Sequence, residues 1–295
     1  MPDTIDEKTA TRNDDAIENV ISAVGELPAS PAIVSSVMGL TSDLDSNVTD
    51  ISRVLSSDQS LTAKVLKLSN SSFYGRSKGV RTLQEAVLIL GFFTVRSLVV
   101  ATSTHSMYMK DDEYGLKKKL WQHSLSSAVT ARQLAERIGY DDGDELFIAA
   151  LLHDIGKLVM MQKMSKQYEE IVVRVQDEQR EFYDVEHEVF GFSHDQVAKV
   201  LLESWSFPES IIESVCWHHQ LPPIEEGIPV PGAYLINLSN SVAKSFGVGF
   251  NNPVPENIAD LESARVFGLN EDDINEIAAR AFEQYQSEVG IFEEA

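Results

Sequence analysis

Apolar side chains recur at three- and four-residue intervals along most of the chain, and this spacing restricts its fold more than any other feature. Ile17, Val20, Ile21 and Val24 show the pattern near the start. It is typical of the buried face of an amphipathic helix. Runs that alternate with a period of two are missing, and no Asn-Gly or Asp-Gly turn joins two alternating segments. The sequence therefore predicts an all-α protein.

Capping residues mark where several of these helices begin and end. Asp58 or Ser60 precedes the apolar positions that start at Leu61, and Thr82 precedes a helix that Gly91 closes. Ser30-Pro31 supplies an N-cap and a first-turn proline for an earlier helix. We expect further helices at 92–109, 116–139, 144–162, 165–180, 193–205, 208–217 and 232–247, and a final acidic helix from Glu271.

The stretch from Asp111 to Gly115 is polar and without periodicity, and it divides the chain. A chain of 295 residues is long enough for two small helical units as well as for one large domain. We expect two packed helical sub-domains, with four segments in all. They are a flexible N-terminal tail at 1–18, an N-terminal helical half at 19–112, a histidine-containing helical half at 113–250 and an acidic helical extension at 251–295.

Net charge and cysteine content restrict the classes of partner and the cell compartment that we expect for this protein. The chain has 46 acidic and 24 basic residues, a net charge of −22, which repels nucleic acid and anionic membranes. We therefore expect no nucleic-acid partner and no membrane partner. Cys216 is the only cysteine, so no internal disulfide can form, and the first residues do not resemble a secretory signal. We expect a cytoplasmic protein.

Five of the seven histidines lie on or at the ends of four different predicted helices. They are His123, His153 next to Asp154, His194, and the pair His218-His219. His105 and His187 lie outside this set. Helical bundles build transition-metal sites from ligands on several helices. A single histidine such as His123 is more often a packed residue that makes one hydrogen bond.

His153-Asp154 is a stronger signal, because Ala149 to Leu152 precede it and Ile155-Gly156 follow. An ionisable pair is thus placed against the core, where burial without a partner costs several kcal/mol. The partner is either a metal ion or the pair itself with nearby backbone. Spacing alone leaves both open.

The residues around this pair resemble the HD superfamily of metal-dependent phosphohydrolases. The resemblance rests on Leu151-Leu152-His153-Asp154-Ile155-Gly156-Lys157, with His123 upstream and His218-His219 downstream. Other motifs resemble, more narrowly, the HDOD family, the HD-related output domain of bacterial signalling proteins. They are Leu27 to Pro31, Asp58 to Thr62, Leu66 to Gly75, Glu85 to Gly91, Phe190 to His194 and Trp205 to Pro208. The resemblance spans roughly residues 21–245.

The resemblance implies that the C-terminal half is an HD-like helical bundle with a pocket for a divalent transition metal, iron, zinc or manganese. The implied metal-binding residues are His123, His153, Asp154, His194, His218 and His219. We add Asn240 as a further candidate, because an amide oxygen can still bind a hard cation, and we expect Lys157 to bind a small phosphorylated ligand. A lysine in this position also fits a favourable interaction with the helix dipole.

Two positions depart from the diguanylate-phosphodiesterase branch of the superfamily. Lys119 stands where that branch has a glutamate, and Asn240 where it has an aspartate. An amide oxygen brings no charge to a metal site. The Gly-Tyr-Pro loop of that branch is also missing, because His219 is followed by Gln220-Leu221-Pro222-Pro223.

These departures favour a non-catalytic regulatory module for signal transduction, with no residue assigned to catalysis, whose partners are other signalling proteins. The alternative is a metal-dependent phosphohydrolase or phosphodiesterase that acts on a nucleotide or cyclic dinucleotide. A third interpretation, a sensor for a metal or a small anion, uses the same residues without turnover.

The partner surface is expected in the N-terminal half, which has one histidine, His105, and no acid–base constellation. Its densest family-like run extends from Asp58 to Gly75. Leu61, Val65, Leu66 and Phe73 in this run are either core or part of a recognition surface, and Lys64 and Lys67 lie on the flank expected to be exposed.

Overall fold

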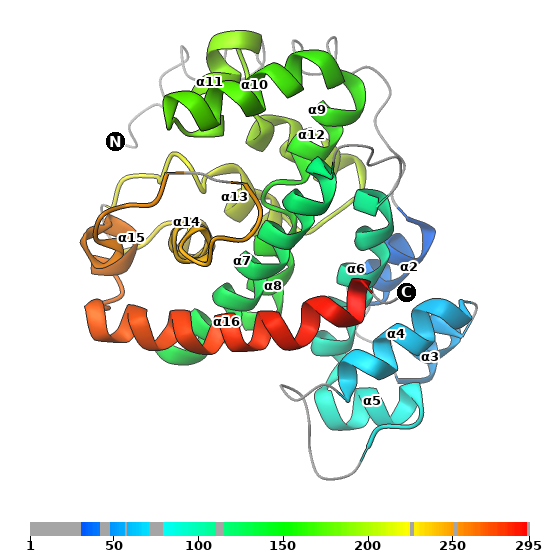
Figure 1. Cartoon of the computed structure of the whole chain (residues 1–295). Coiled ribbons are helices and arrows are strands. Elements are labelled where there is room, and N and C mark those ends of the chain that lie inside the picture. Colours follow the sequence, from blue (N-terminus) through cyan, green and yellow to red (C-terminus); the bar gives the residue numbers. More distant parts are fainter. Residues whose placement is uncertain are drawn as a thin grey trace, which may run out of the picture.

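The computed structural model describes residues 31–41, 48–56, 58–70, 79–109, 115–224, 227–250 and 253–293, and every regular element in these ranges is helical (Figure 1). The predicted all-α class is therefore confirmed. The tail at 1–18 and the helix expected to carry Ile17 to Val24 fall outside the described residues.

In the described part of the N-terminal half the chain forms five helices: α2 (Ala32–Thr41), α3 (Val48–Leu55), α4 (Gln59–Ser69), α5 (Leu83–Leu90) and α6 (Phe92–Met109). Their ends follow the expected caps. The Asp58 carboxylate accepts a hydrogen bond from the Leu61 amide at 2.9 Å. Thr82 and Glu85 form a capping box at the start of α5, and Gly91 ends this helix with a φ of +88°.

The C-terminal half continues with α7 (Leu116–Ile138), α8 (Gly143–Leu152), α9 (Ile155–Lys163), α10 (Ser165–Glu178), α11 (Phe182–Phe190), α12 (His194–Ser204), α13 (Glu209–Cys216) and α14 (Pro231–Lys244). The chain then forms η1 (Ile258–Asp260), α15 (Glu262–Arg265) and α16 (Glu271–Glu293). Helix α7 lies at the centre and packs against α8, α14 and α16.

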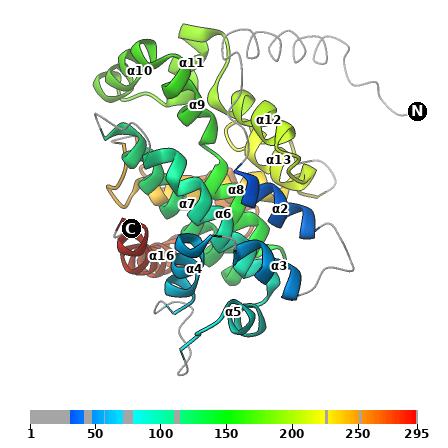
Figure 2. The ribbon, with the colours of Figure 1, turned by 90° about the vertical axis from the view of Figure 1, so that its right-hand side faces the viewer.

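The buried apolar side chains form a small core and a large one. Helices α3, α4 and α5 gather at one end of the molecule, around the small core (Figure 2). Helix α6 joins the two cores, because Val95 and Val99 face the small core while Leu98 and Ala101 face the large one. The domain boundary at 112/113 lies in a stretch that the structure does not describe, and it stays a prediction.

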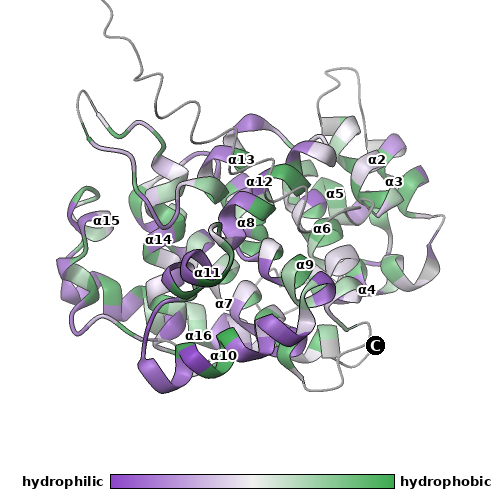
Figure 3. Cartoon of the chain, turned by 90° about the horizontal axis from the view of Figure 1, so that it is seen from above, coloured by the Kyte–Doolittle hydropathy of each residue, from purple (hydrophilic) through white to green (hydrophobic). Residues whose placement is uncertain are grey.

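Surface helices bury a narrow stripe. Helix α10 buries Tyr168, Ile171, Val172 and Val175, a three- and four-residue spacing. Apart from the exposed Val173, the rest of this helix is hydrophilic (Figure 3). Helix α16 begins at Glu271, as expected, and buries Ile274 and Ile277 against the large core. None of the described helices is both long and apolar enough to cross a bilayer.

The prediction of a single helix over 144–162 is wrong in one respect. The helix is interrupted at His153-Asp154, between α8 and α9. The His153 ring donates from Nδ1 to the Ala150 carbonyl at 2.7 Å. The Lys157 amide donates a hydrogen bond to the Asp154 carbonyl at 2.9 Å, and this bond closes the first turn of α9. The apolar pattern runs through the break without interruption, so the pattern alone does not indicate it.

Helix α11 was not among the expected helices, and neither were η1 and α15. Only Phe182, Val185 and Glu186 are buried on α11. Phe182, Val185, Val189 and Phe190 nevertheless follow a three- and four-residue spacing, so the helical pattern is present in the sequence. Gly191, with a φ of +77°, ends α11 and gives the sharp turn into α12.

Gly156 lets the first turn of α9 lie directly on α12. A Cβ atom at this position would lie 1.9 Å from the carbonyl oxygen of His194 and 2.8 Å from its carbonyl carbon. These are backbone atoms, which cannot rotate away. We expect Gly156→Ala to force the helices apart and to lower the free energy of unfolding by about 3 kcal/mol, measured by urea denaturation.

Gly290→Ala is the matched control, because Gly290 lies in α16 and a Cβ there would meet nothing within 4 Å. A helical alanine in open space should stabilise the protein by up to about 1 kcal/mol. Equal unfolding midpoints for Gly156→Ala and the parent protein would show that α9 and α12 do not approach this closely.

Candidate metal centre

Four helices deliver a buried cluster of imidazoles around one carboxylate. Helix α7 supplies His123, the α8–α9 break supplies His153 and Asp154, α12 begins at His194, and His218 and His219 follow α13. Every one of these side chains is buried except that of His219, which is half-buried. The structure thus brings together the six candidate residues that the sequence distributes over nearly 100 positions.

The cluster consists of two groups whose nitrogen and oxygen atoms lie within 4.8 Å of one another in each group. The Asp154 group is His123, His153 and Asp154, and the His194 group is His194, His218 and His219. Oxygen Oδ2 of Asp154 lies 3.7 Å from Nε2 of His123 and 3.5 Å from Nε2 of His153. Oxygen Oδ1 lies 3.2 Å from Nε2 of His194. Asp154 therefore contacts both groups, one oxygen to each.

Backbone carbonyls fix two of the imidazole rings. Nδ1 of His153 lies 2.7 Å from the Ala150 carbonyl oxygen, and Nδ1 of His218 lies 2.5 Å from that of Val215. A carbonyl only accepts, so both Nδ1 atoms donate and both Nε2 atoms carry a lone pair. These two Nε2 atoms are buried and have no hydrogen-bond partner among the residues that the structure describes. The arrangement is typical of histidines that bind a metal.

Glu186 of α11 holds His194. Its Oε2 lies 2.6 Å from Nδ1 of His194 and accepts a hydrogen bond from the His194 amide at 2.9 Å. Its Oε1 accepts from the Tyr168 hydroxyl at 2.5 Å. Sequence reasoning missed Glu186 because α11 was not expected. Its place next to Val185, four residues after Phe182, was the signal that could have found it: a carboxylate on the apolar stripe of a helix.

Burial keeps most of the cluster imidazoles neutral. It lowers the pKa of His123 to about 3 and that of His153 to about 4, with Asp154 opposing the shift in both. Burial, with the neighbouring imidazoles, also holds the pKa values of His218 and His219 well below the usual range. At neutral pH these four rings therefore offer lone pairs rather than protons.

Asp154 and His194 carry the charges. Burial alone would raise the pKa of Asp154, but His153, Lys157 and His194 outweigh it and hold this pKa well below the usual range. Burial alone would lower the pKa of His194, but Glu186 outweighs it and raises the pKa to about 9. A cation that binds Nε2 of His194 must therefore displace a proton.

The donor set fits a divalent transition metal. It offers neutral imidazole nitrogens with defined tautomers and one ionised carboxylate, the ligands that zinc, iron and manganese use. The unpartnered, buried Nε2 atoms of His153 and His218 support this fit, because buried polar atoms are rarely left without a partner.

The remaining sequence candidates have different environments. Asn240 lies on α14, and its buried amide oxygen has no hydrogen-bond partner. Lys157 is buried, with Nζ 2.9 Å from Oδ2 of Asp154. Lys119 is exposed at the surface, one turn before His123. The ammonium that contacts the cluster is therefore that of Lys157, and the charge of Lys119 faces water.

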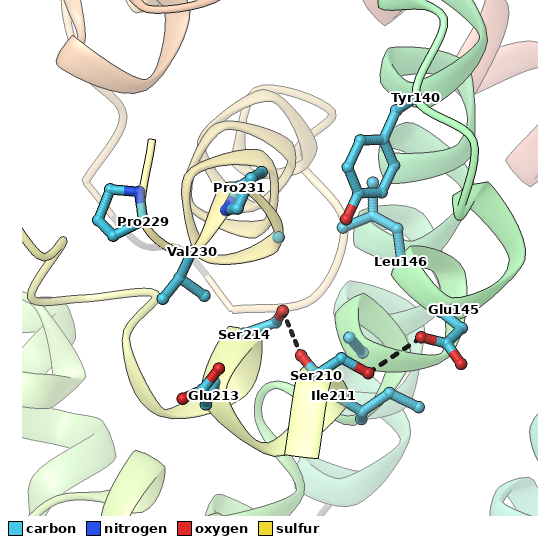
Figure 4. A pocket seen from close by; sticks show the side chains of 12 residues that line it. Tyr140, Glu145, Leu146, Ser210, Ile211, Glu213, Ser214, Pro229, Val230 and Pro231 are labelled. Carbon is cyan, nitrogen blue, oxygen red and sulfur yellow. Dashed lines mark hydrogen bonds between the residues drawn. The ribbon is translucent and has the colours of Figure 1, made fainter. Parts of the chain in front are cut away.

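A separate cavity of about 120 Å³ lies between α8, α13 and the start of α14, near Tyr140 (Figure 4). None of the described residues that line it belongs to the histidine cluster. Its two serine hydroxyls already have partners: that of Ser210 donates to Glu145 at 3.0 Å, and that of Ser214 donates to the Ser210 carbonyl at 2.6 Å. The histidine cluster is the better candidate for chemistry.

The fold and the cluster together define an all-helical domain with a candidate metal centre. The family model of the HDOD domain matches residues 27–221. The chain therefore belongs to the HDOD family.

Several known proteins are similar to it. The crystal structure of an HDOD domain protein of unknown function from Geobacter sulfurreducens is 26% identical, with a TM-score of 0.78 over 97% of each chain. A candidate phosphohydrolase from Shewanella amazonensis SB2B shares the fold at 23% identity, with a TM-score of 0.72 over 93% of this chain and 97% of that one. An uncharacterised Treponema pallidum (strain Nichols) protein is 24% identical over 214 residues, 70% of this chain. The match spans 40% of that relative's length.

The hydrogen bond from His194 to Glu186 gives a test of the centre. We expect Glu186→Gln to weaken Zn²⁺ binding about 10- to 100-fold, because the amide aligns the ring less firmly and makes Nε2 less basic. Competition with a chelator measures the affinity. Glu188→Gln is the control on the same helix, because Glu188 is exposed and pairs only with Arg174 and Arg180. Equal affinities for both variants would remove Glu186 from the centre.

Proposed function

We propose that this chain is a regulatory domain of a signalling system that binds a divalent transition metal in its histidine cluster and hydrolyses phosphoesters slowly or not at all. The observation that carries the proposal is the charge of the cluster. Five imidazoles surround one carboxylate, Asp154, and the ammonium of Lys157 already balances that carboxylate at 2.9 Å.

The residues that would hold the metal are those with free lone pairs, together with Asp154. A bound metal would supply a Lewis acid that activates water and neutralises phosphoryl oxygens. Two-metal hydrolysis needs several anionic ligands to hold its ions close together, and Asn240 supplies no charge. The residues present therefore favour binding over turnover.

The alternative function is a metal-dependent phosphohydrolase that acts on a nucleotide or a cyclic dinucleotide. Two observations favour it: Asp154 contacts both groups of ligand atoms, and the Lys157 ammonium adds to this site the positive charge that a phosphorylated ligand needs. The two functions differ in turnover, which is directly measurable.

We expect protein loaded with zinc, iron or manganese to hydrolyse cyclic dinucleotides and nucleotide monoesters far more slowly than about 1 s⁻¹, the lower end of ordinary enzyme rates. The reason is the lack of anionic ligands. Release of phosphate or of the linear dinucleotide measures the rate. A rate near 1 s⁻¹ that disappears in His153→Ala would establish the alternative function instead.

The regulatory proposal also needs a contact surface, and the N-terminal half offers an apolar one. At the α5–α6 junction the side chains of Leu88, Ile89 and Phe93 are 75%, 38% and 55% exposed. Grouped exposed apolar side chains mark protein interaction sites. On α4, by contrast, Leu61 and Val65 are buried in the small core. Phe73 lies outside the described residues, and we place the contact at the junction rather than on the flank with Lys64 and Lys67.

We expect Leu88→Lys to weaken binding of a signalling protein at least tenfold, because an ammonium in the patch loses the apolar contact. The change should leave thermal stability within about 0.5 kcal/mol, as usual for surface positions. In-cell cross-linking followed by mass spectrometry identifies the partner and compares the variants. Val173→Lys is the control, because Val173 is also 55% exposed but lies on α10. Equal cross-linking of both variants would exclude the junction as the contact.

A further inference from the structure

We propose that the ammonium of Lys157 takes the place of a cation in the Asp154 group, so that the protein binds one metal ion, in the His194 group, and not two. The inference rests on the proposed metal-binding function and defines it more narrowly. Its basis is the unequal distribution of charge over two groups that otherwise offer similar ligand atoms.

Lys157 is fixed in the Asp154 group by two contacts and by its burial. Its Nζ lies 2.9 Å from Oδ2 of Asp154, the oxygen that also faces His123 and His153. The same Nζ lies 4.6 Å from the centre of the Phe182 ring, a cation–π distance. The side chain is 4% exposed, on the first turn of α9. The ammonium therefore has no route into water that keeps these contacts.

A divalent ion held by the Asp154 group would have to share Oδ2 with this ammonium. The two like charges would lie only a few ångströms apart in a buried site, where repulsion is strong. Lys244, the other lysine whose charge acts on His123, is half-buried and pairs with Glu181 at 2.6 Å, away from Oδ2 of Asp154. A divalent ion in the Asp154 group would therefore share a single carboxylate with the Lys157 ammonium. Repulsion between these two cations disfavours metal binding in this group.

The His194 group has two carboxylates near it, where the Asp154 group has one. Oxygen Oδ1 of Asp154 lies 3.2 Å from Nε2 of His194, and the Glu186 carboxylate lies behind the same ring at 2.6 Å. Nε2 of His219 lies 3.0 Å from Nε2 of His194, and Nε2 of His218 is unpartnered. Two carboxylates and three imidazoles therefore act on one position. The charge of Lys157 also acts on His194 and His219, but its ion pair is with Oδ2 of Asp154 and not with these rings. A single metal ion belongs here.

The test counts bound ions. Each protein is dialysed to equilibrium against Zn²⁺ in a chelator-buffered solution, and zinc per chain is measured by plasma mass spectrometry. We expect about one ion in the parent protein and about two in Lys157→Met, which keeps the length of the side chain and its contact with Phe182. Lys157→Arg retains the charge and should stay at one, as should Lys163→Met, the control at an exposed lysine of α9.

Adding His123→Ala to Lys157→Met should return the count to one, because it removes a ligand of the Asp154 group. A count that stays at two would place the second ion elsewhere and overturn the inference. Two ions in the parent protein, or one in both the parent and Lys157→Met, would also overturn it and leave the proposed metal binding intact.

If the proposed metal binding is wrong, the ion counts of the parent protein and of Lys157→Met differ from those above. No ion in the parent protein but one in Lys157→Met would support exclusion by the lysine and refute native metal binding. No ion in either protein would refute both. If circular dichroism shows that Lys157→Met does not fold, Lys157→Gln replaces it. The count in the parent protein then still decides, because one ion supports the inference and two overturn it.

Discussion

The burial of an ionised carboxylate is the constraint around which the C-terminal half is arranged. Asp154 is 1% exposed, and an unpaired charge at such a depth is strongly destabilising. The surrounding helices place the ammonium of Lys157 next to one oxygen of Asp154 and the protonated ring of His194 near the other. The His194 ring is held in turn by Glu186, which Tyr168 binds. Helices α9, α10, α11 and α12 are thus tied together through one side chain.

The features that the sequence predicts well are the local ones. Asp58, Thr82 and Gly91 act within one helical turn, so their roles can be inferred without knowledge of the fold. The convergence of the cluster could also be predicted, because five histidines on four helices, next to a family-like motif, point to one site. The break at His153-Asp154 was not, since it depends on a ring bonding to a carbonyl and on the approach of α12. The exposed side chain of Lys119 likewise depends on packing between helices that are distant in sequence, whereas Glu186 has a local signal, its place on the apolar stripe of α11.

The two halves are connected by polar contacts as well as by apolar packing. The Thr94 hydroxyl on α6 donates to Asp144 of α8 at 3.0 Å, and the Ser97 hydroxyl donates to the Asp144 carbonyl at 3.1 Å. Arg132 of α7 binds the same carboxylate at 3.0 Å. Because α6 carries Phe93 at one end and α8 leads to the break at His153, these contacts form a continuous physical link between the apolar patch and the cluster.

The partial exposure of His219 bears on the rate at which an ion exchanges. Every other cluster side chain is closed off from water, so an ion that arrives from solvent meets His219 first. The Tyr183 ring lies 5.0 Å from that imidazole and is itself half-buried. Under the proposed metal binding, entry and departure of an ion would therefore depend on the motion of these two rings. The time that the site takes to respond to a change in metal supply would then be set by the side chains at its mouth rather than by diffusion.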